Sequence, residues 1–350
     1  RPRRDLRAPW QHRGMDSLTH VVLGAAIGVA VTGRRVAPWK AALWGAACNT
    51  LPDLDVFIDH GDAVSNMVLH RGHSHSLFWL TLLAPLLALV ASRLIGGAGF
   101  KRWWLATGLA LLTHPLLDLM TVYGTQLLQP FSDHPYSVGS LFIIDPGVTL
   151  PLLAGLAAAL WLRSARGQRW NATGLALAAA YVAWSAVAQQ QVQSLALASA
   201  RSQGLAPQRV LVTPAPLNTL LWRVVLVQDG HYHEGFRSLL DRSERIHFES
   251  FDRGAALAPL LRPVEAAQRI RHFSHGFYKL SRTGEELLIT DLRMGQEPNY
   301  VFGFVVAHQD ANGHVRPLPR PWQVGSNIDA GRGLAWLLPR MLGRPLPPPR

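Results

Sequence analysis

Cysteine is nearly absent from this chain, since Cys48 is the only one among 350 residues. A single thiol excludes an internal disulfide framework and a cysteine-rich zinc module. Cys48 lies in an apolar run, where a free cysteine ordinarily serves as a small buried side chain. Glycine loops of the P-loop and dinucleotide types are missing, as is a Gly-x-Ser-x-Gly elbow. The sequence therefore offers no motif for nucleotide binding or serine-hydrolase chemistry.

Charge is also scarce, because only 16% of the residues are charged whereas 49% are hydrophobic. In a globular domain, about a quarter of the residues are usually charged. Most of the apolar bias lies over 18–188, and the part after about residue 201 is richer in charge, proline and alternating strand patterns. The net charge of +12 comes mainly from arginines spread over loops and both ends, without an aromatic-interleaved basic patch. We therefore expect a membrane surface rather than nucleic acid as the partner.

The length leaves room for two domains. We predict an α-helical membrane domain over 15–193, with about six transmembrane or partly inserted helices, and a small soluble β-rich domain over 194–350. Residues 1–14 lack the apolar core of a cleavable secretory signal, and Met15 is a cleaner start. We expect residues 1–14 to be an extension without folded structure.

Six apolar segments precede the change in composition. They are 18–32, 37–51, 77–95, 103–120, 142–162 and 170–188. The last four suit a bilayer core of about 30 Å. The first two are short and rich in small residues, such as Gly24, Gly28 and Gly45, so they either pack closely against neighbours or enter the membrane without crossing it.

The charge of the loops predicts an orientation. With six spans, the loops at 33–40, 93–102 and 163–169 fall on one side and hold nine basic residues, whereas the opposite loops hold only Arg71. Short basic loops remain in the cytoplasm, so the polar clusters described below are predicted to be extracytoplasmic. The five arginines within residues 1–14 argue against an N-terminus on that side.

The second half predicts strands at 221–227, 286–292 and 300–308, with hairpin turns at Asp229-Gly230 and Asn312-Gly313. After the turn at Asp229-Gly230, His231 and His233 share one face of the returning strand, next to Glu234. We interpret them as residues of a solvated strand edge rather than as a metal site, and His272 and His275 likewise as ordinary surface residues.

Three polar clusters stand out against the apolar background. His114 and Asp118 are four residues apart in a predicted helix and share one face, which suits a shared metal ion or, equally well, an ion pair within the helix. Asp53 and Asp55 follow Pro52. In an extended piece these alternate carboxylates share a side and can converge on a cation, whereas residues of a surface turn need no ion.

The third cluster holds His70, His73 and His75 around Gly72. Neutral imidazole is the commonest metal ligand, and glycine lets the backbone turn so that several rings point inward. An interfacial proton relay or a solvated histidine cluster is the alternative. All three clusters, with His20, fall at one predicted membrane face. Because buried carboxylates and imidazoles are costly in apolar surroundings, a shared cation is the simplest common explanation, and we predict a metal site.

These residues carry a family resemblance. Thr19-His20, Pro52-Asp53-Leu54-Asp55, His70-Arg71-Gly72-x-Ser74-His75-Ser76 and His114-x-x-x-Asp118 with Tyr123-Gly124 resemble the YdjM/YbcI-like family. Its members are described as inner-membrane proteins assigned to the metal-dependent hydrolases, some under LexA control. The resemblance covers about 15–190 and extends more loosely to Pro214-x-Pro216-x-Asn218, Trp222-Arg223 and Asp291-Leu292-Arg293. His73 falls at a variable position and ranks lower as a ligand.

The histidines and aspartates of these motifs are more distantly similar to the metal ligands of the zinc-dependent phospholipase C group. This resemblance implies a phosphoesterase centre with two or three metal ions. Imidazole and carboxylate ligands suit zinc first, with manganese or iron(II) as alternatives. Asp55 is either a further ligand or the base that takes a proton from water, and Arg71 would bind an anion such as phosphate or pair with lipid headgroups. The implied metal ligands are His20, Asp53, His70, His75, His114 and Asp118. Asp145 is an outer candidate that could equally cap a helix, and Tyr123 and Asp133 are weaker ones.

The favoured hypothesis is a membrane-bound metal-dependent hydrolase that acts on phosphoesters or lipid headgroups at the extracytoplasmic face. The alternative is a membrane protein that binds or transports metal without hydrolysis. A third is a structural metal that locks helices together.

Overall fold

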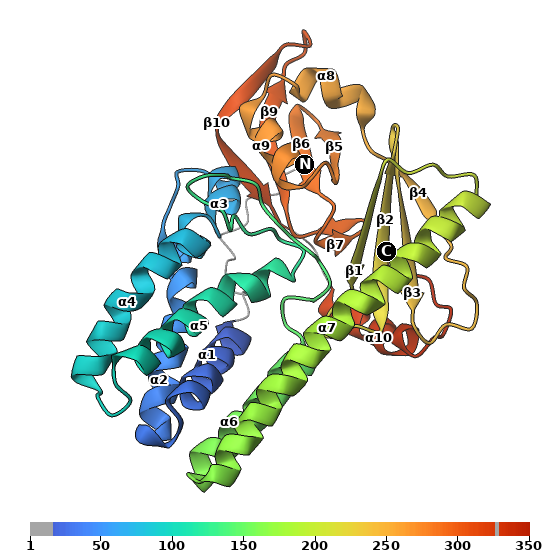
Figure 1. Cartoon of the computed structure of the whole chain (residues 1–350). Coiled ribbons are helices and arrows are strands. Elements are labelled where there is room, and N and C mark those ends of the chain that lie inside the picture. The colour runs from blue at the N-terminus through green and yellow to red at the C-terminus, as the bar shows by residue number, and fades with distance from the viewer. Residues whose placement is uncertain (1–16, 326–328) are drawn as a thin grey trace.

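The computed structural model describes residues 17–325 and 329–350, so the predicted extension at 1–14 lies outside the described residues. A helical N-terminal half is followed by a β-rich C-terminal domain, as the composition predicts (Figure 1). Each predicted apolar segment is a helix. In chain order these are α1 (Ser17–Thr32), α2 (Pro38–Thr50), α4 (Leu77–Leu94), α5 (Phe100–Leu119), α6 (Pro146–Leu162) and α7 (Ala165–Ser202).

The helices α1 and α2 cross at glycines. A Cβ atom added at Gly24 would clash with the carbonyl oxygen of Gly45, and one added at Gly45 would clash with that of Gly24. One added at Gly28 would meet the carbonyl oxygen of Ala41 in the same way. Small residues at a crossing let two backbones approach closely. The predicted close packing of the first two segments is confirmed.

Two helices among the described residues, α4 and α7, are long and apolar enough to cross a membrane, and α6 is apolar but shorter. This criterion concerns length and composition only, so six spans stay a prediction. The connections α1–α2, α4–α5 and α6–α7 all lie at the end of the helical half that points away from the β-rich domain (Figure 1). These connections carry the basic residues that the predicted orientation uses.

A single helix, α7, joins the two halves. Its 38 residues correspond to about 57 Å at the usual rise per residue. The first part packs against α6, and the last part buries a stripe of residues four apart against strands β1 (Arg209–Pro214) and β2 (Leu221–Gln228). The stripe consists of Ala188, Val192, Ala196 and Ala200. The helix therefore runs past residue 193, where the sequence predicts the domain boundary.

The C-terminal domain contains two four-stranded antiparallel sheets. The first has the order β1-β2-β3-β4, with β3 at His231–Ser238 and β4 at Glu249–Asp252. The second has the order β10-β9-β6-β5, and a short β7-β8 ladder accompanies it. The strands involved are β5 (Tyr278–Thr283), β6 (Glu286–Asp291), β7 (Gly295–Gln296), β8 (Asn299–Tyr300), β9 (Gly303–Gln309) and β10 (Val315–Val324). The helices α8 (Ala258–Leu261), α9 (Glu265–Phe273) and α10 (Ala330–Met341) complete the domain. The predicted strands and both hairpin turns are confirmed.

The interpretation of β3 as a solvated edge is wrong. Since β4 pairs with it on one side and β2 on the other, β3 lies inside its sheet. His233 is buried, and the buried Glu234 carboxylate accepts a hydrogen bond from Arg223 Nε at 2.7 Å. The hairpin turn was visible in the sequence, but the pairing with a short distant strand was not.

The C-terminal domain packs onto the polar end of the helical half. A short helix, α3 (Ala63–Leu69), shares a core with α9 and the second sheet, through residues that include Val64, Met67 and Ile270. Arg293, held by Asp291, donates from Nη1 to the carbonyl oxygens of Val122 and Tyr123 at 3.2 and 2.8 Å. The C-terminal domain therefore holds the segments that follow α3 and α5 in place.

Candidate metal centre

Four side chains from three segments converge at the end of the helical half that faces the C-terminal domain. His114 and Asp118 lie on one face of the last turns of α5, as their spacing predicts. Asp53 comes from the 3-10 helix η2 (Leu51–Phe57), directly after α2. His75 comes from the 3-10 turn η3 (His73–His75), directly before α4. All but Asp53 are buried, and Asp53 is nearly so.

The ligand atoms of these four residues have the spacing of a metal site. His75 Nε2 lies 3.1 Å from His114 Nε2, 3.5 Å from Asp53 Oδ1 and 3.2 Å from Asp118 Oδ2. His114 Nε2 lies 3.3 Å from Asp53 Oδ1 and 3.4 Å from Asp118 Oδ2. Zinc bonds to nitrogen and oxygen of about 2.0–2.1 Å give a tetrahedron whose edges are about 3.3 Å. We call these four residues the metal tetrad.

The backbone conformation of the segment that holds Asp53 and Asp55 differs from the prediction. The segment is a 3-10 helix, not an extended piece, so the two carboxylates do not share a side. Asp53 joins the tetrad, whereas Asp55 contacts His70, Arg71 and Ser74. The extended geometry was wrong because Pro52 lies in the first turn of a 3-10 helix that continues directly from α2.

The turn before His75 depends on unusual backbone geometry. Arg71 has a φ of +61°, which is uncommon for a residue with a side chain. A Cβ at Gly72 would lie 2.8 Å from the carbonyl oxygen of Leu69, so only glycine fits there without a shift. This turn sends Arg71 and His75 inward and leaves His73 exposed. The lower rank given to His73 agrees with this placement.

A relay of hydrogen bonds fixes the tautomer of His75. Ser74 Oγ donates to Asp55 Oδ2 at 2.6 Å, and it lies 2.8 Å from His75 Nδ1. Because the single hydroxyl proton goes to the carboxylate, His75 Nδ1 must carry a proton and donate to Ser74 Oγ. The Nε2 lone pair then faces the tetrad, as a metal ligand requires.

Asp55 is the acceptor at the base of this relay. Its Oδ1 lies 2.9 Å from His70 Nδ1, and its Oδ2 also accepts from the Arg71 backbone N–H at 3.0 Å. Burial raises the pKa of the Asp55 carboxyl, but the hydrogen bonds with His70 and Ser74 hold the pKa below its ordinary value. Asp55 is therefore a carboxylate at neutral pH that positions His70, Ser74 and, through Ser74, His75.

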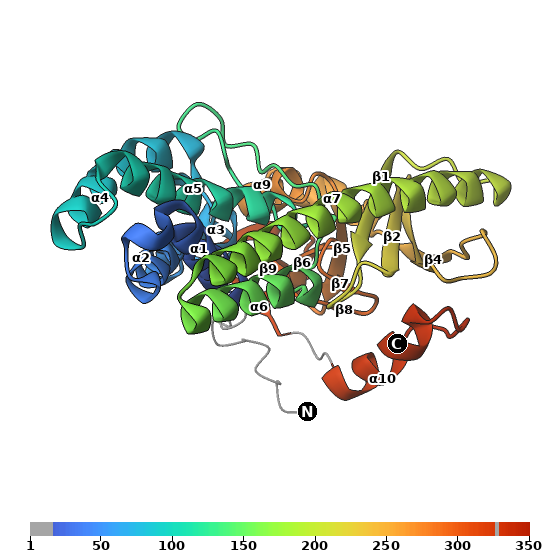
Figure 2. The ribbon, with the colours of Figure 1, turned by 60° about the horizontal axis from the view of Figure 1, so that its bottom comes forward.

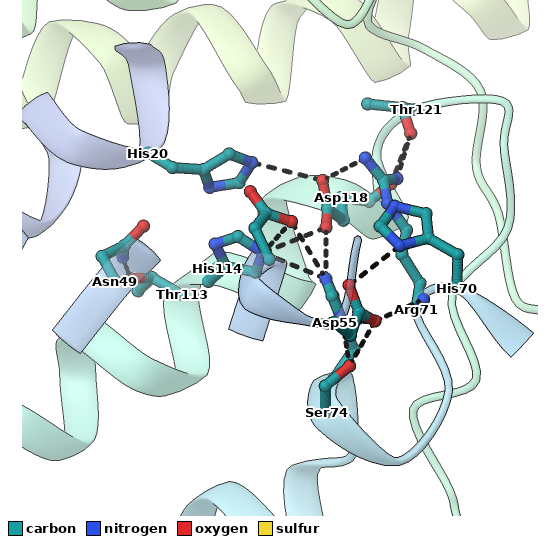
Figure 3. A network of polar contacts seen from close by, with 12 residues as sticks. His20, Asn49, Asp55, His70, Arg71, Ser74, Thr113, His114, Asp118 and Thr121 are labelled. Atoms are coloured by element: carbon teal, nitrogen blue, oxygen red, sulfur yellow. Dashed lines mark hydrogen bonds and ion pairs between the residues drawn. The ribbon is translucent and has the colours of Figure 1, made fainter. Parts of the chain in front are cut away.

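The second oxygen of Asp118 faces a different group of residues (Figure 3). Arg71 Nη2 lies 2.8 Å from Asp118 Oδ1, and His20 Nε2 lies 3.2 Å from the same oxygen. Arg71 Nη1 also donates to Thr121 Oγ1 at 3.1 Å. Of the six predicted ligands, His20 and His70 thus lie outside the tetrad, His20 against Asp118 and His70 against Asp55.

A divalent cation fits the tetrad on chemical grounds. The buried group contains the carboxylates of Asp53, Asp55 and Asp118 and the guanidinium of Arg71, which leaves two negative charges when the histidines are neutral. Asp53 Oδ1 and Asp118 Oδ2 have no hydrogen-bond donor among the described residues. Electron-rich atoms packed this closely in a buried site repel one another unless protons or a cation lie between them.

Two cavities adjoin the centre. A small one of about 20 Å³, on the side of Asp118 and Arg71, is also lined by Thr19, Asp53 and Asp145. A larger one of about 210 Å³ lies on the far side of Asp55 and His70 and is lined by Phe57, Ile58 and His60. The first is large enough to hold one water molecule beside the predicted ligands.

The outer candidates have distinct positions. Asp145 caps α6 by accepting from the Gly147 N–H at 2.9 Å, and it also lines the small cavity. Tyr123 packs its ring 5.1 Å from the Arg71 guanidinium carbon and donates to the Met67 carbonyl oxygen. Asp133 is exposed. Sequence reasoning gave no role to Ser74 or Thr121, although the hydroxyl between two histidines was a usable signal.

We compared the chain with known protein families. The sequence model of the family described as YdjM inner membrane protein matches residues 15–192, which contain the whole metal tetrad. The Uncharacterized protein YfhP of Bacillus subtilis (strain 168) is 32% identical over 153 residues, which are 41% of this chain and 46% of YfhP. The Inner membrane protein YbcI of Escherichia coli (strain K12) is 35% identical over 122 residues, which are 34% of this chain and 69% of YbcI. The chain spans about half the length of YfhP. No solved structure matches.

Proposed function

This chain belongs to the YdjM inner membrane protein family, and we propose that it is a membrane-bound metal-dependent hydrolase of phosphoesters or lipid headgroups at the extracytoplasmic face. The observation that carries the proposal is the metal tetrad, whose ligand atoms lie 3.1–3.5 Å apart in five measured pairs. Mixed imidazole and carboxylate ligands favour zinc, with manganese and iron(II) as alternatives.

The small cavity supports a reactive site rather than a closed structural one. Structural zinc sites are closed by four protein ligands, as the tetrad alone would be in tetrahedral geometry, so the proposal requires a fifth coordination position that is open to water or substrate. A divalent ion held by the tetrad would act as a Lewis acid on a phosphoryl oxygen and would acidify a bound water. Because the cavity is lined by Asp53 and Asp118, it is where such an open position would point.

Arg71 and Asp145 complete the proposed site. The Arg71 guanidinium lines the same cavity, where it would hold an anionic oxygen of the substrate while its bond to Asp118 keeps that carboxylate in place. Asp145 also lines this cavity, whereas Asp55 does not. We therefore assign the uptake of a proton from water to Asp145, and we assign to Asp55 the positioning of the histidines.

Metal analysis combined with turnover tests this proposal. The purified full chain should contain a transition metal in a fixed ratio and should hydrolyse a phospholipid or a generic phosphodiester. Asp145→Asn should keep the metal and lose turnover, whereas Asp53→Ala should lose both. A metal-loaded wild-type protein that is inactive on every phosphoester would contradict the hydrolase, and the same metal content in Asp53→Ala would contradict the site itself.

Transport of the metal is the second candidate, and the distribution of charge disfavours it. A transport path needs ionisable residues through the depth of the membrane. In α1, α4, α5 and the apolar part of α7, the ionisable residues lie near the helix ends, and α6 contains none. Uptake of radioactive zinc into vesicles that contain the protein would reverse this preference.

A further inference from the structure

The C-terminal helix α10 presents an apolar face that no described residue covers. Leu334, Leu338 and Leu342 follow one another at intervals of four, and their exposed fractions are 57%, 57% and 56%. Gly331 and Ala335 share this face, which therefore carries no charge over the length of the helix. In Figure 2, α10 lies along the outside of the C-terminal domain.

The opposite face of α10 is firmly attached to the domain. Arg340 forms two contacts with the Asp241 carboxylate at 2.6 and 2.8 Å and donates to the Phe236 carbonyl oxygen at 2.9 Å. The Trp336 ring packs edge-on against Phe236, with the ring centres 5.0 Å apart. The helix is thus anchored to the end of β3, and its orientation leaves the leucines on the outside.

This end of β3 is the end closest to the apolar part of α7. Ser238, the last residue of β3, pairs with Leu221, the first residue of β2. The segment just before β2 reaches into the apolar part of α7, where the Thr219 hydroxyl lies 3.0 Å from the Tyr181 hydroxyl. In Figure 1, α10 lies at the lower end of the β2 and β3 strands, on the side toward α6.

Neighbouring loops extend the apolar face and add positive charge around it. Leu240, beside the attachment of α10, is 52% exposed, and Leu217, in the segment before β2, is 41% exposed. Three arginines near this face are exposed: Arg332 in α10, Arg344 just after α10, and Arg242 in the loop after β3. An amphipathic helix with an apolar face and flanking arginines has the composition of helices that lie in the headgroup region of a bilayer.

We propose that α10 lies flat on the membrane and inserts Leu334, Leu338 and Leu342 among the lipids. The occupant of this face is the bilayer in which α7 is embedded, because the end of β3 that carries α10 is the end nearest the apolar part of α7. The arginines around it fit anionic headgroups. The C-terminal domain is then held to the membrane at two places, α7 and α10, on the side of the metal tetrad.

Fluorescence quenching in bilayers tests this placement without reference to catalysis. The full chain, with the buried Cys48 changed to alanine, receives a single cysteine by Leu338→Cys and is labelled with bimane. It is then reconstituted into nanodiscs of equimolar phosphatidylcholine and phosphatidylglycerol. The matched control is Asn312→Cys, in the exposed turn between β9 and β10. Leu334→Cys provides a second label on the proposed face, so the result does not depend on one variant.

We expect lipids with brominated acyl chains to quench the labels at residues 338 and 334 several-fold more than the label at 312, and aqueous iodide to give the reverse order. Iodide quenching at 338 equal to that at 312 would overturn the proposal. Protection from both quenchers at 338 and 334 would also overturn it, because a protein surface would then cover α10. Each variant is accepted only if its circular dichroism spectrum and size-exclusion elution match those of the Cys48→Ala parent, which separates misfolding from exposure.

Discussion

Replacing Ser74 by alanine tests the tautomer relay that directs His75 toward the tetrad. The Ser74 hydroxyl joins the Asp55 carboxylate at 2.6 Å to His75 Nδ1 at 2.8 Å. Without it, His75 Nδ1 faces Asp55 Oδ2 at 3.7 Å, which is too long for a hydrogen bond. Loss of a partner that orients a ligand typically lowers metal affinity about 10- to 100-fold, or about 1.4–2.7 kcal/mol. We expect Ser74→Ala to weaken metal binding by this amount.

Competition with a chromophoric chelator on the purified chain measures this affinity. His73→Ala is the matched control, because its side chain is exposed in the same turn and it should bind metal as the wild type does. Ser74→Thr keeps a hydroxyl group and should retain most of the affinity. A Ser74→Ala protein with wild-type affinity would refute the relay and would leave the protonation of His75 without a structural explanation.

Three further predictions concern the scaffold. Gly45→Leu should destabilise the helical half by about 3 kcal/mol, measured by thermal unfolding in detergent, because its side chain would clash with the backbone of Gly24. Arg293→Met should speed amide exchange in the loop after α5, because it removes both hydrogen bonds that Nη1 donates to the carbonyl oxygens of that loop. Burial raises the pKa of Glu297, but the hydrogen bond from Lys279 holds this pKa below its ordinary value of about 4.5. The ionised Glu297 therefore stabilises the domain above about pH 4.5 and less as the pH falls through the folded-state pKa. Glu297→Gln should speed amide exchange of β7 and β8 at pH 7, and progressively less as the pH falls from 4.5 through the folded-state pKa.

The helices could be predicted because apolar runs of helical length are separated by glycine, proline and charged residues. The pairing of His114 with Asp118 followed from the same logic, since a spacing of four residues fixes a common face on any helix. The gathering of Asp53 and His75 with this pair was predicted from their shared position at the ends of apolar segments. These parts of the site depend on local periodicity and on which end of a helix a residue occupies.

The remaining features depend on contacts that local sequence does not encode. The segment of Asp53 and Asp55 is too short for a periodic pattern, so an extended and a 3-10 conformation could not be told apart. The role of Ser74 requires knowing that Asp55 lies on its other side. The burial of Glu234 arises from β4, which the hairpin signal at residues 229–230 does not predict.

The metal tetrad lies in the part of the chain that the family model matches, and no described residue of the second half belongs to it. All four ligands lie before residue 120, within the range that matches the family, and their orientation depends on Ser74 and Asp55 in the same range. The second half instead holds the loop after α5 through Arg293 and packs on α3, just before His70. Because these contacts surround the centre without providing its ligands, changes in the second half should alter access to the site more than its affinity for metal. If truncation after α7 abolished metal binding in a chain that still folds, this division of roles would be wrong.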